Sequence, residues 1–361
     1  MKKSLAILIV CLLTVSLLAG CAGTTVVVKD CGGCGGCCNN PANPTTPSNP
    51  SEPTNPPAEG ALMTGISVST SVSDSTSAGE KDGAVKFDVT VVAVLVDQNG
   101  VIVSCQIDSV PGTVGINAAG EITSDLTAAV PTKNELGENY GMVAWGGAIA
   151  EWDAQVAALC RYAEGKTVAQ LKDGAIDESG KAPEGSDLSS SATIYLGGFV
   201  SGIEKAVNNA QNLGAEAGDT LKLSIISKLS GANGAEGYAQ LDSDIAAVTV
   251  RDGVITSCVI DSVQAKVSFD STGTITSDLT AQILTKNELG ENYGMAAWGG
   301  AIAEWNVQAA AFARYVTGKT AAEVAGISVN ESTKPAEGTD LSASVTIAIG
   351  GFQALIAKAL A

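Results

Sequence analysis

The stretch VTVRDGVITSCVID, from Val248 to Asp261, is the part of the sequence that decides the fold class. Branched apolar residues alternate with other residues on both sides of Asp252-Gly253, a pair favoured in tight hairpin turns. A similar pattern stands earlier in the chain, where a β-branched run at 85–96, a turn at Asn99-Gly100 and a returning run at 101–107 follow one another. Both stretches predict antiparallel hairpins.

The two hairpins belong to a long internal repeat. The motif TKNELGENYGM runs from Thr132 to Met142 and returns unchanged from Thr285 to Met295, which is an offset of 153 residues. This offset holds without a gap over 100–206 and 253–359. Because solenoid repeats recur every ~20–50 residues, a repeat of this length indicates tandem domains. We expect these domains at 64–212 and 213–361.

Each copy is predicted to place strands before helices. A further strand pair is expected at 112–117 and 121–126, after the hairpin of the first copy. An apolar stripe of helical period then begins at Trp145, and at Trp298 in the second copy, so the tryptophans are expected to pack on the sheet. The predicted fold class is α+β: two tandem domains, each a curved antiparallel sheet with helices packed on one face.

Signals inside the helical part predict where its segments begin and end. Gly165 is expected to end the first helix. Thr167 and Gln170 have the spacing of a capping box that opens a second, short helix, and the final segment is expected to be helical from about Gly197 or Gly350.

The first residues predict export. Two lysines precede an apolar run at 5–18, and this pattern at 1–20 is typical of a signal peptide. The sequence Leu-Ala-Gly before Cys21 resembles a bacterial lipobox, which implies that Cys21 is diacylated and becomes the mature N-terminus. We therefore expect an extracytoplasmic protein, lipid-anchored to the bacterial membrane. An uncleaved anchor or ordinary secretion would also place it outside the cytoplasm.

Residues 21–63 are predicted to be a spacer that contains a Cys/Gly tract and a proline-rich run. The tract holds Cys31, Cys34, Cys37 and Cys38 at a spacing that could bind zinc or an iron-sulfur cluster. Its many glycines provide no shell around a metal, so we expect a flexible tether with free or oxidised thiols and no metal site. Cys105 and Cys258 are expected to be small apolar core residues.

Composition excludes several classes of function. The formal net charge of -18 disfavours nucleic acid as a partner, since phosphates would be repelled. The chain has no histidine, which excludes Ser-His-Asp and Cys-His catalysis and histidine-bound zinc or haem. No paired-carboxylate motif or nucleotide-binding loop is present. We expect a redox carrier or binding protein more than a catalyst.

The hairpin, the middle helix that ends in Gly-Lys-Thr and the late Asp-x-x-Ser segment resemble the FMN-binding domain family of exported electron-transfer proteins. The resemblance covers about 85–206 and 248–359. In that family a threonine in a pattern like Asp-x-x-Ser-Gly-Ala-Thr receives FMN through a phosphoester, attached by a separate flavin transferase. The resemblance implies Thr193 as the acceptor, with Asp187 and Ser190 in the same pattern.

The second copy keeps less of that pattern. It retains Asp340 and Thr346, whereas the first copy differs at Ser191, which replaces the glycine. Glycine permits a close approach to phosphate that serine resists, so both copies are weakened acceptors and the second is the worse one. If no flavin is attached, the aspartates are turn or capping residues and the threonines are strand residues beside a core.

A non-covalently bound flavin is a separate possibility, because an aromatic slot with nearby cations could hold the ring and the phosphate. Tyr140 and Tyr293, with Lys133 and Lys286, are the candidates for that contact. The first functional hypothesis is thus an extracytoplasmic flavin-binding or electron-carrier protein with a redox partner. The alternative is a cofactor-free surface module that binds an extracellular ligand or protein, and a structural envelope protein is a third reading.

Overall fold

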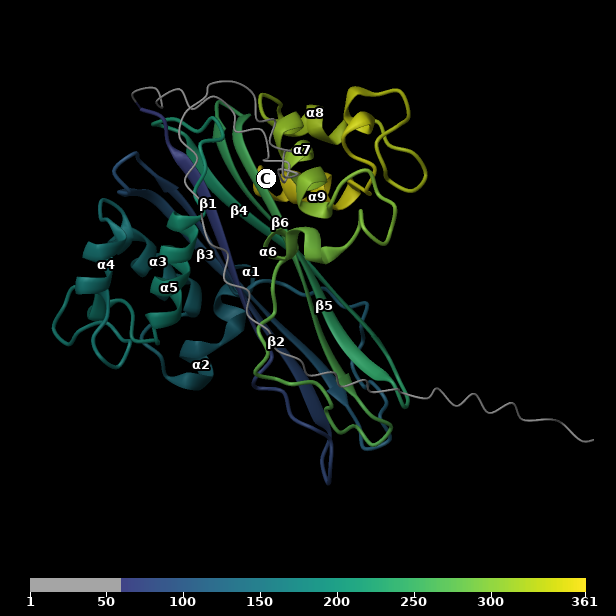
Figure 1. The fold of residues 1–361 in the computed structure, drawn as a ribbon. Helices are drawn as coiled ribbons and strands as arrows, with labels where there is room; N and C mark the ends of the chain where they lie inside the picture. The colour runs from purple at the N-terminus through teal and green to yellow at the C-terminus, as the bar shows by residue number, and fades with distance from the viewer. Residues whose placement is uncertain (1–59) are drawn as a thin grey trace, which may run out of the picture. The chain divides into compact units, whose positions relative to one another are not determined.

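The computed structural model describes residues 60–361, which belong to one compact unit. The predictions made for the signal peptide, for the lipid-anchored Cys21, for the Cys31–Cys38 tract and for most of the spacer lie outside the described residues. The fold class is α+β, with two three-stranded antiparallel sheets and several helices (Figure 1).

The two sheets have the same simple order, in which each strand pairs with the next one in the chain. The first sheet consists of β1 (Met63–Ser71), β2 (Gly83–Val96) and β3 (Ile102–Ile116). The second consists of β4 (Thr220–Ala232), β5 (Gly237–Arg251) and β6 (Val254–Phe269).

Helices follow each sheet in the chain. After β3 come α1 (Lys133–Leu136), η1 (Gly137–Tyr140), α2 (Met142–Gly146), α3 (Trp152–Ala163), α4 (Val168–Ala175), η2 (Leu188–Ser190) and α5 (Gly197–Asn208). After β6 come α6 (Lys286–Leu289), η3 (Gly290–Tyr293), α7 (Trp305–Val316), α8 (Ala321–Ala325), η4 (Asp340–Ala343) and α9 (Gly350–Ala359).

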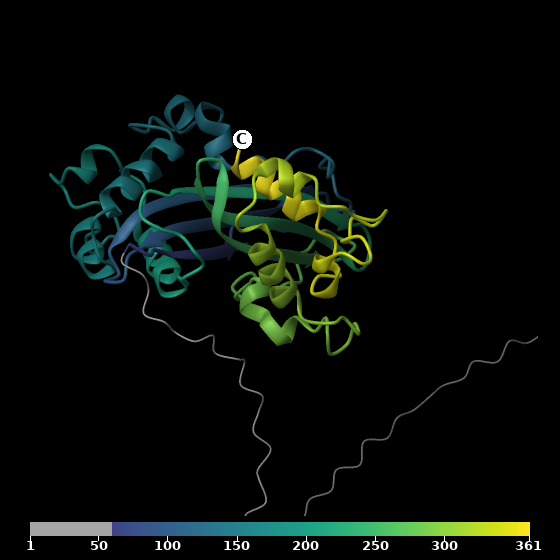
Figure 2. The same cartoon turned by 90° about the horizontal axis from the view of Figure 1, so that it is seen from above.

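The strands alternate between two hydrophobic cores because successive side chains point to opposite faces of a sheet. In β2, Val85, Phe87 and Val89 lie in a core shared with the second sheet, whereas Val92 and Val94 pack against α3 and α5. The second sheet repeats this arrangement with α7 and α9. The sheets therefore lie face to face between two helical groups (Figure 2).

The strand predictions were right for the hairpins and wrong beyond them. β3 runs without interruption through 112–116, and 121–126 forms a turn with a single bridge between Ile116 and Ile122. Pro111 lies inside β3, where a break was expected. β3 is an edge strand of its sheet, and an edge strand tolerates proline because one row of its amides has no partner strand. The edge strand β1 was not predicted.

The helix that was expected to begin at Trp145 is instead two helices. Gly147, with φ of 63°, ends α2, and α3 begins only at Trp152. Trp152 and its counterpart Trp305 are buried as predicted, but Trp145 and Trp298 are 85% and 87% exposed. The prediction that all four tryptophans pack on the sheets was therefore wrong for two of them.

Other local predictions are confirmed. α3 ends at Ala163, two residues before Gly165, which has φ of 78°. Thr167 opens α4 with a complete capping box that includes Gln170, and α5 begins at Gly197. Cys105 and Cys258 are both buried.

The two halves exchange equivalent contacts. Glu135 of the first half pairs with Lys358 of the second at 2.6 Å, and Glu288 of the second pairs with Lys205 of the first at 2.5 Å. The predicted boundary at 212/213 falls in the connection between α5 and β4. The repeated motif thus takes part in joining the halves.

Candidate functional site

The repeated motif TKNELGENYGM is a rigid, capped turn in both halves. The Thr132 hydroxyl accepts a hydrogen bond from the Glu135 amide, and the Glu135 carboxylate accepts one from the Thr132 amide. Thr285 and Glu288 form the same reciprocal pair. Such a capping box satisfies amides that a helix start would leave free, so the four-residue helices α1 and α6 begin at a fixed place.

Lys133 and Lys286 point inward from this turn. Lys133 is only 7% exposed; its Nζ lies 2.8 Å from a carboxylate oxygen of Asp88 and 5.4 Å from the ring centre of Tyr140. The Lys286 Nζ lies 5.3 Å from the ring centre of Tyr293. Burial lowers the pKa of Lys286, an effect that the nearby Asp244 and Asp242 oppose.

The lysines also contact the buried tryptophans. The Nζ atoms of Lys133 and Lys286 lie 5.1 and 4.9 Å from the ring centres of Trp152 and Trp305, at the start of α3 and α7. A cation over an indole ring is attracted by the negative face of the ring. The structure therefore brings the predicted lysine and tyrosine of each copy together, and it uses them to hold the motif on the helix.

A carboxylate lies beneath each turn, buried in the second half and partly buried in the first. Asp261 is 5% exposed and accepts hydrogen bonds from the amides of Ser262 and Asn287. Burial is the largest influence and raises the pKa of Asp261 to about 6. Asp108 holds Asn134 in the same way, and burial raises its pKa too.

The residues that follow the motif present a tryptophan to solvent. Gly141 has φ of 81°, and the ring of Trp145 lies so close to it that an added Cβ would be 2.6 Å from a ring carbon. The Glu151 carboxylate accepts hydrogen bonds from the amides of Met142 and Val143, at 2.8 and 2.9 Å. Only glycine fits at position 141, because the backbone there is left-handed and the Trp145 ring occupies the space of a side chain.

The second half repeats this construction. Gly294 has φ of 80° beside the ring of Trp298, and the Glu304 carboxylate accepts hydrogen bonds from the amides of Met295 and Ala296. We call the segments 141–150 and 294–303 the tryptophan loops. Neither loop contains a charged residue. Their exposed apolar side chains are Val143, Trp145, Ile149, Trp298 and Ile302.

The predicted flavin acceptors Thr193 and Thr346 occupy equivalent positions before α5 and α9. The Oε1 atom of the buried Gln155 accepts hydrogen bonds from the Thr193 amide at 2.8 Å and from its hydroxyl at 3.4 Å. Gln308 binds Thr346 in the same manner, at 2.8 and 3.2 Å. Thr193 is exposed and Thr346 is half-buried, and neither lies in a strand.

The remaining residues of the predicted flavin pattern lie on the surface. Asp187 and Asp340 are exposed at the start of η2 and in the first turn of η4. The Ser190 hydroxyl donates a hydrogen bond to the Asp187 carbonyl, at 2.7 Å. α3 separates this segment from Lys133, because its Trp152 contacts the lysine and its Gln155 binds the threonine.

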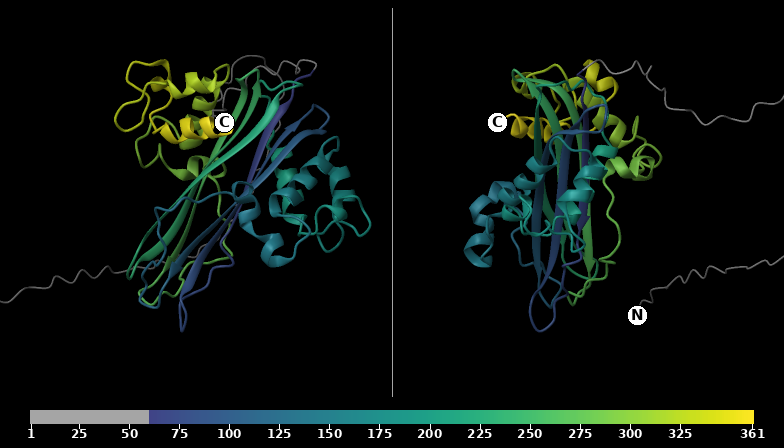
Figure 3. Two further views of the ribbon diagram at one scale, coloured as in Figure 1. Left: turned by 180° about the vertical axis from the view of Figure 1, so that it is seen from behind. Right: turned by 90° about the vertical axis from the view of Figure 1, so that its left-hand side faces the viewer.

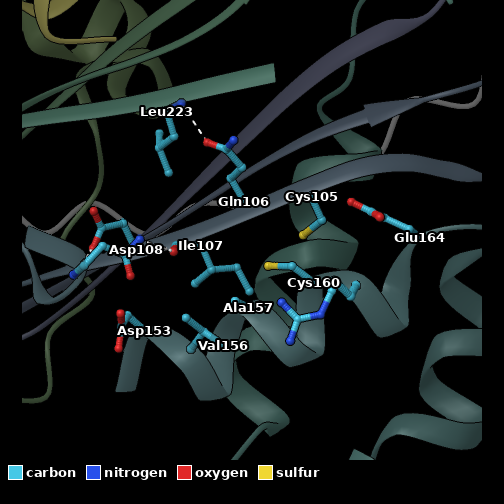
Figure 4. Close-up of a pocket in the computed structure, with 12 residues that line it drawn as sticks. Cys105, Gln106, Ile107, Asp108, Asp153, Val156, Ala157, Cys160, Glu164 and Leu223 are labelled. Carbon is cyan, nitrogen blue, oxygen red and sulfur yellow. Dashed lines mark hydrogen bonds between the residues drawn. The ribbon is translucent and has the colours of Figure 1, made fainter. Parts of the chain in front are cut away.

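Two cavities lie beside the motif. One, of about 370 Å³, is lined by residues of β3 and α3 and by Leu223 (Figure 4). The other, of about 500 Å³, is lined by Lys205, Asp261 and Glu288 among others, between α5 and the second copy of the motif. Thr193 and Thr346 line neither cavity.

Within residues 60–361, no cluster of acidic, cysteine or histidine side chains could hold a metal ion. In the same range, no helix has both the length and the apolar character needed to cross a membrane. The sequence matches no protein-family model, and neither a curated protein nor a solved structure shows significant similarity to it.

Sequence reasoning missed three features of the site. The exposure of Trp145 was signalled by Gly146-Gly147, since two glycines in succession end a helix. The roles of Glu151 and Gln155 had no local signal, because each acts on backbone groups that only the folded chain brings near. Both residues are repeated as Glu304 and Gln308, which is the one trace they leave in the sequence.

Proposed function

We propose that this protein is a cell-envelope binding protein whose two tryptophan loops attach to a protein partner. The proposal treats the halves as tandem domains with curved sheets, each of which supplies one loop, and it relies on the expected lipid anchor at Cys21. The observation that carries it is the near-complete exposure of Trp145 and Trp298 on loops whose backbone is fixed.

The surroundings of the tryptophans favour an apolar protein surface over a sugar. Sugar recognition needs polar side chains around an aromatic ring, whereas Trp145 has the aliphatic Val143 and Ile149 in its own loop. Burial of a tryptophan side chain in a partner would contribute roughly 4 kcal/mol from apolar area. Because the loop is already ordered, little of that gain is lost in fixing it.

The positions of the loops support a partner that binds at two places. α2 and the segment between α6 and α7 extend to opposite sides of the sheets (Figures 2 and 3). The two loops therefore serve two partner molecules or two sites of a larger assembly. Because the two loops lie on opposite sides of the sheets, they do not form one continuous surface.

Photo-crosslinking in intact cells tests this proposal. A photoreactive amino acid at position 143 or 296 lies next to the exposed tryptophan, and both positions are expected to yield the same crosslinked protein. Trp145→Ala should abolish the product from 143 and leave that from 296. The matched control is position 103 on β3, where Val103 is also exposed. The same product from position 103 would contradict the proposal.

FMN carriage on Thr193 or Thr346 is the second candidate function. It is supported by one observation, the equivalent placement of both hydroxyls beside a buried glutamine. When bound, FMN would supply one- or two-electron transfer, and a flavin transferase and a redox partner would be needed. Gln155 would then orient the acceptor segment, with Asp187 and Ser190 available to the transferase.

The absorption spectrum and the intact mass of protein purified from its native host test flavin carriage. A flavin band with an FMN-sized mass increment is the expected result, and Thr193→Ala should remove more of it than Thr346→Ala. In this second proposal Gln155 positions Thr193 through its hydrogen bonds and does not bind FMN itself. A colourless protein without the FMN mass increment would rule out flavin carriage, and partner binding would be the remaining candidate function.

A further inference from the structure

Two cysteines of the first half lie next to each other in the lining of the cavity of about 370 Å³. Cys105 projects from β3 and Cys160 from α3, and their sulfur atoms point toward one another (Figure 4). Both thiols are buried and free. A hydrogen bond with Cys160 and burial hold the pKa of the Cys105 thiol well above its usual range.

The second half shows that packing does not require this pair. At the equivalent positions, Cys258 of β6 faces a helix that carries Ala313. Cys258 and Ala313 are both buried in the corresponding core, so alanine fills the helix position without loss of the fold. The second thiol is therefore an addition specific to the first half.

The cavity gives small molecules a route to the pair. Its lining includes Arg161 and Glu164, which are exposed, so it reaches the surface beside the sulfur atoms. The lining carries Asp108, Asp153 and Glu164 beside Arg161, so it favours a cationic disulfide such as cystamine over an anionic one.

We propose that Cys105 and Cys160 form a reversible disulfide site, oxidised by a small-molecule disulfide. One thiolate attacks the reagent and releases one reduced thiol, and the second cysteine then displaces the other. Two S–H bonds are lost and one S–S bond forms, while the reagent takes up two electrons and two protons. The high pKa of Cys105 makes the reaction slow at neutral pH and faster as the pH rises.

The bond would fix α3 to β3. Gln155 and Trp152, which support the acceptor segment and the motif, are on the same helix, so oxidation would tighten the scaffold beneath both. A disulfide that closes a chain segment of this length restricts the unfolded state, and we expect Tm to rise by several degrees.

Peptide mapping of the full chain tests the inference. The protein is incubated with cystamine, denatured, alkylated and digested with trypsin without reduction. Tryptic peptides 87–133, 134–161 and 252–266 each contain one cysteine, namely Cys105, Cys160 and Cys258. We expect 87–133 and 134–161 to be joined, with a loss of about 2 Da relative to their sum. Cys258 should be alkylated throughout.

Two variants make the test decisive. Cys160→Ala copies the natural second half and should abolish the linked peptide and the rise in Tm. Ala313→Cys should create the same linkage to Cys258, which provides a positive control for the geometry. Alkylation of both Cys105 and Cys160 after oxidation of the folded chain would overturn the inference. Linkage of either one to a cysteine of the 31–38 tract would overturn it as well.

Discussion

Gly141 and Trp145 illustrate how a single residue pair can fix an aromatic ring at a surface. The glycine adopts a left-handed conformation, and the space that a side chain would fill is taken by the indole. Any side chain larger than hydrogen at position 141 must therefore displace the tryptophan ring. Gly294 and Trp298 make the same contact in the second half.

The first prediction follows from this contact. Gly141→Ala should destabilise the fold by about 1–2 kcal/mol, because alanine is strained at this φ, and should move the ring. Tryptophan near-ultraviolet circular dichroism and urea unfolding measure the two effects. Gly146→Ala is the matched control, since no atom lies within 4 Å of its added Cβ. Equal spectra and stabilities for the two variants would contradict the described contact.

The second prediction concerns Asp261, whose pKa is raised from 3.8 to about 6. Between these values the folded chain binds more protons than the unfolded chain, so this group weakens the fold as pH rises through 6. Asp261→Asn removes the cost and keeps a carbonyl that accepts the amides of Ser262 and Asn287.

Relative to the parent, the free energy of unfolding of this variant should gain up to about 3 kcal/mol between pH 4 and pH 7. Asp108→Asn serves as the comparison and should shift less, because Asp108 is only partly buried. A constant difference between Asp261→Asn and the parent across this range would show that the carboxylate ionises normally.

At the scale of elements, α3 organises the first half through Gln155. Its Nε2 donates to the Ala150 carbonyl in the tryptophan loop, and its Oε1 accepts from the amides of Thr193 and Ile194. One side chain thus ties the helix to the two segments with proposed functions. Gln308 does the same for α7.

Gln155→Met should therefore cost about 2–4 kcal/mol, because it leaves three partly buried backbone groups without their partner. Urea unfolding measures the loss. Gln308→Met should have a similar effect, whereas a change of the exposed Gln211 to Met should stay within about 0.5 kcal/mol. A loss below 1 kcal/mol for Gln155→Met would show that water replaces these hydrogen bonds.

Elements whose signals come from residues close together in the sequence could be predicted. The hairpins, the capping box at Thr167 and the start of α5 at Gly197 all have local signals, and all are present. The edge strand β1 has an alternation that was not recognised. The ties of Gln155 and Lys133 join residues that lie 38 to 45 positions apart, so no local pattern could reveal them.

At the scale of the described chain, the halves depend on one another. Each sheet turns one face toward the shared core, where Val85 and Phe87 of the first sheet join Leu241 and Phe269 of the second. The reciprocal ion pairs of Glu135 with Lys358 and of Glu288 with Lys205 add to this contact. The tandem copies suggested by the sequence thus share the apolar surface that stabilises them.

This arrangement predicts the behaviour of an isolated half. A chain of residues 64–212 would expose the inner face of its sheet to water, so we expect it to unfold or to self-associate through that face. Sedimentation velocity and circular dichroism measure the outcome, with residues 60–361 as the folded control. A stable, folded monomer of 64–212 would contradict the shared core.

The central claim is that each tryptophan loop is a separate binding site. Titration calorimetry with the purified partner, identified by photo-crosslinking, tests it most directly. The parent is expected to bind at two equivalent sites, Trp145→Ala or Trp298→Ala at one unchanged site, and the double variant about 1,000-fold more weakly, which is too weak for a measurable heat. Val103→Ala, a surface control, should bind as the parent does. Two sites of unchanged affinity in the double variant would contradict the account.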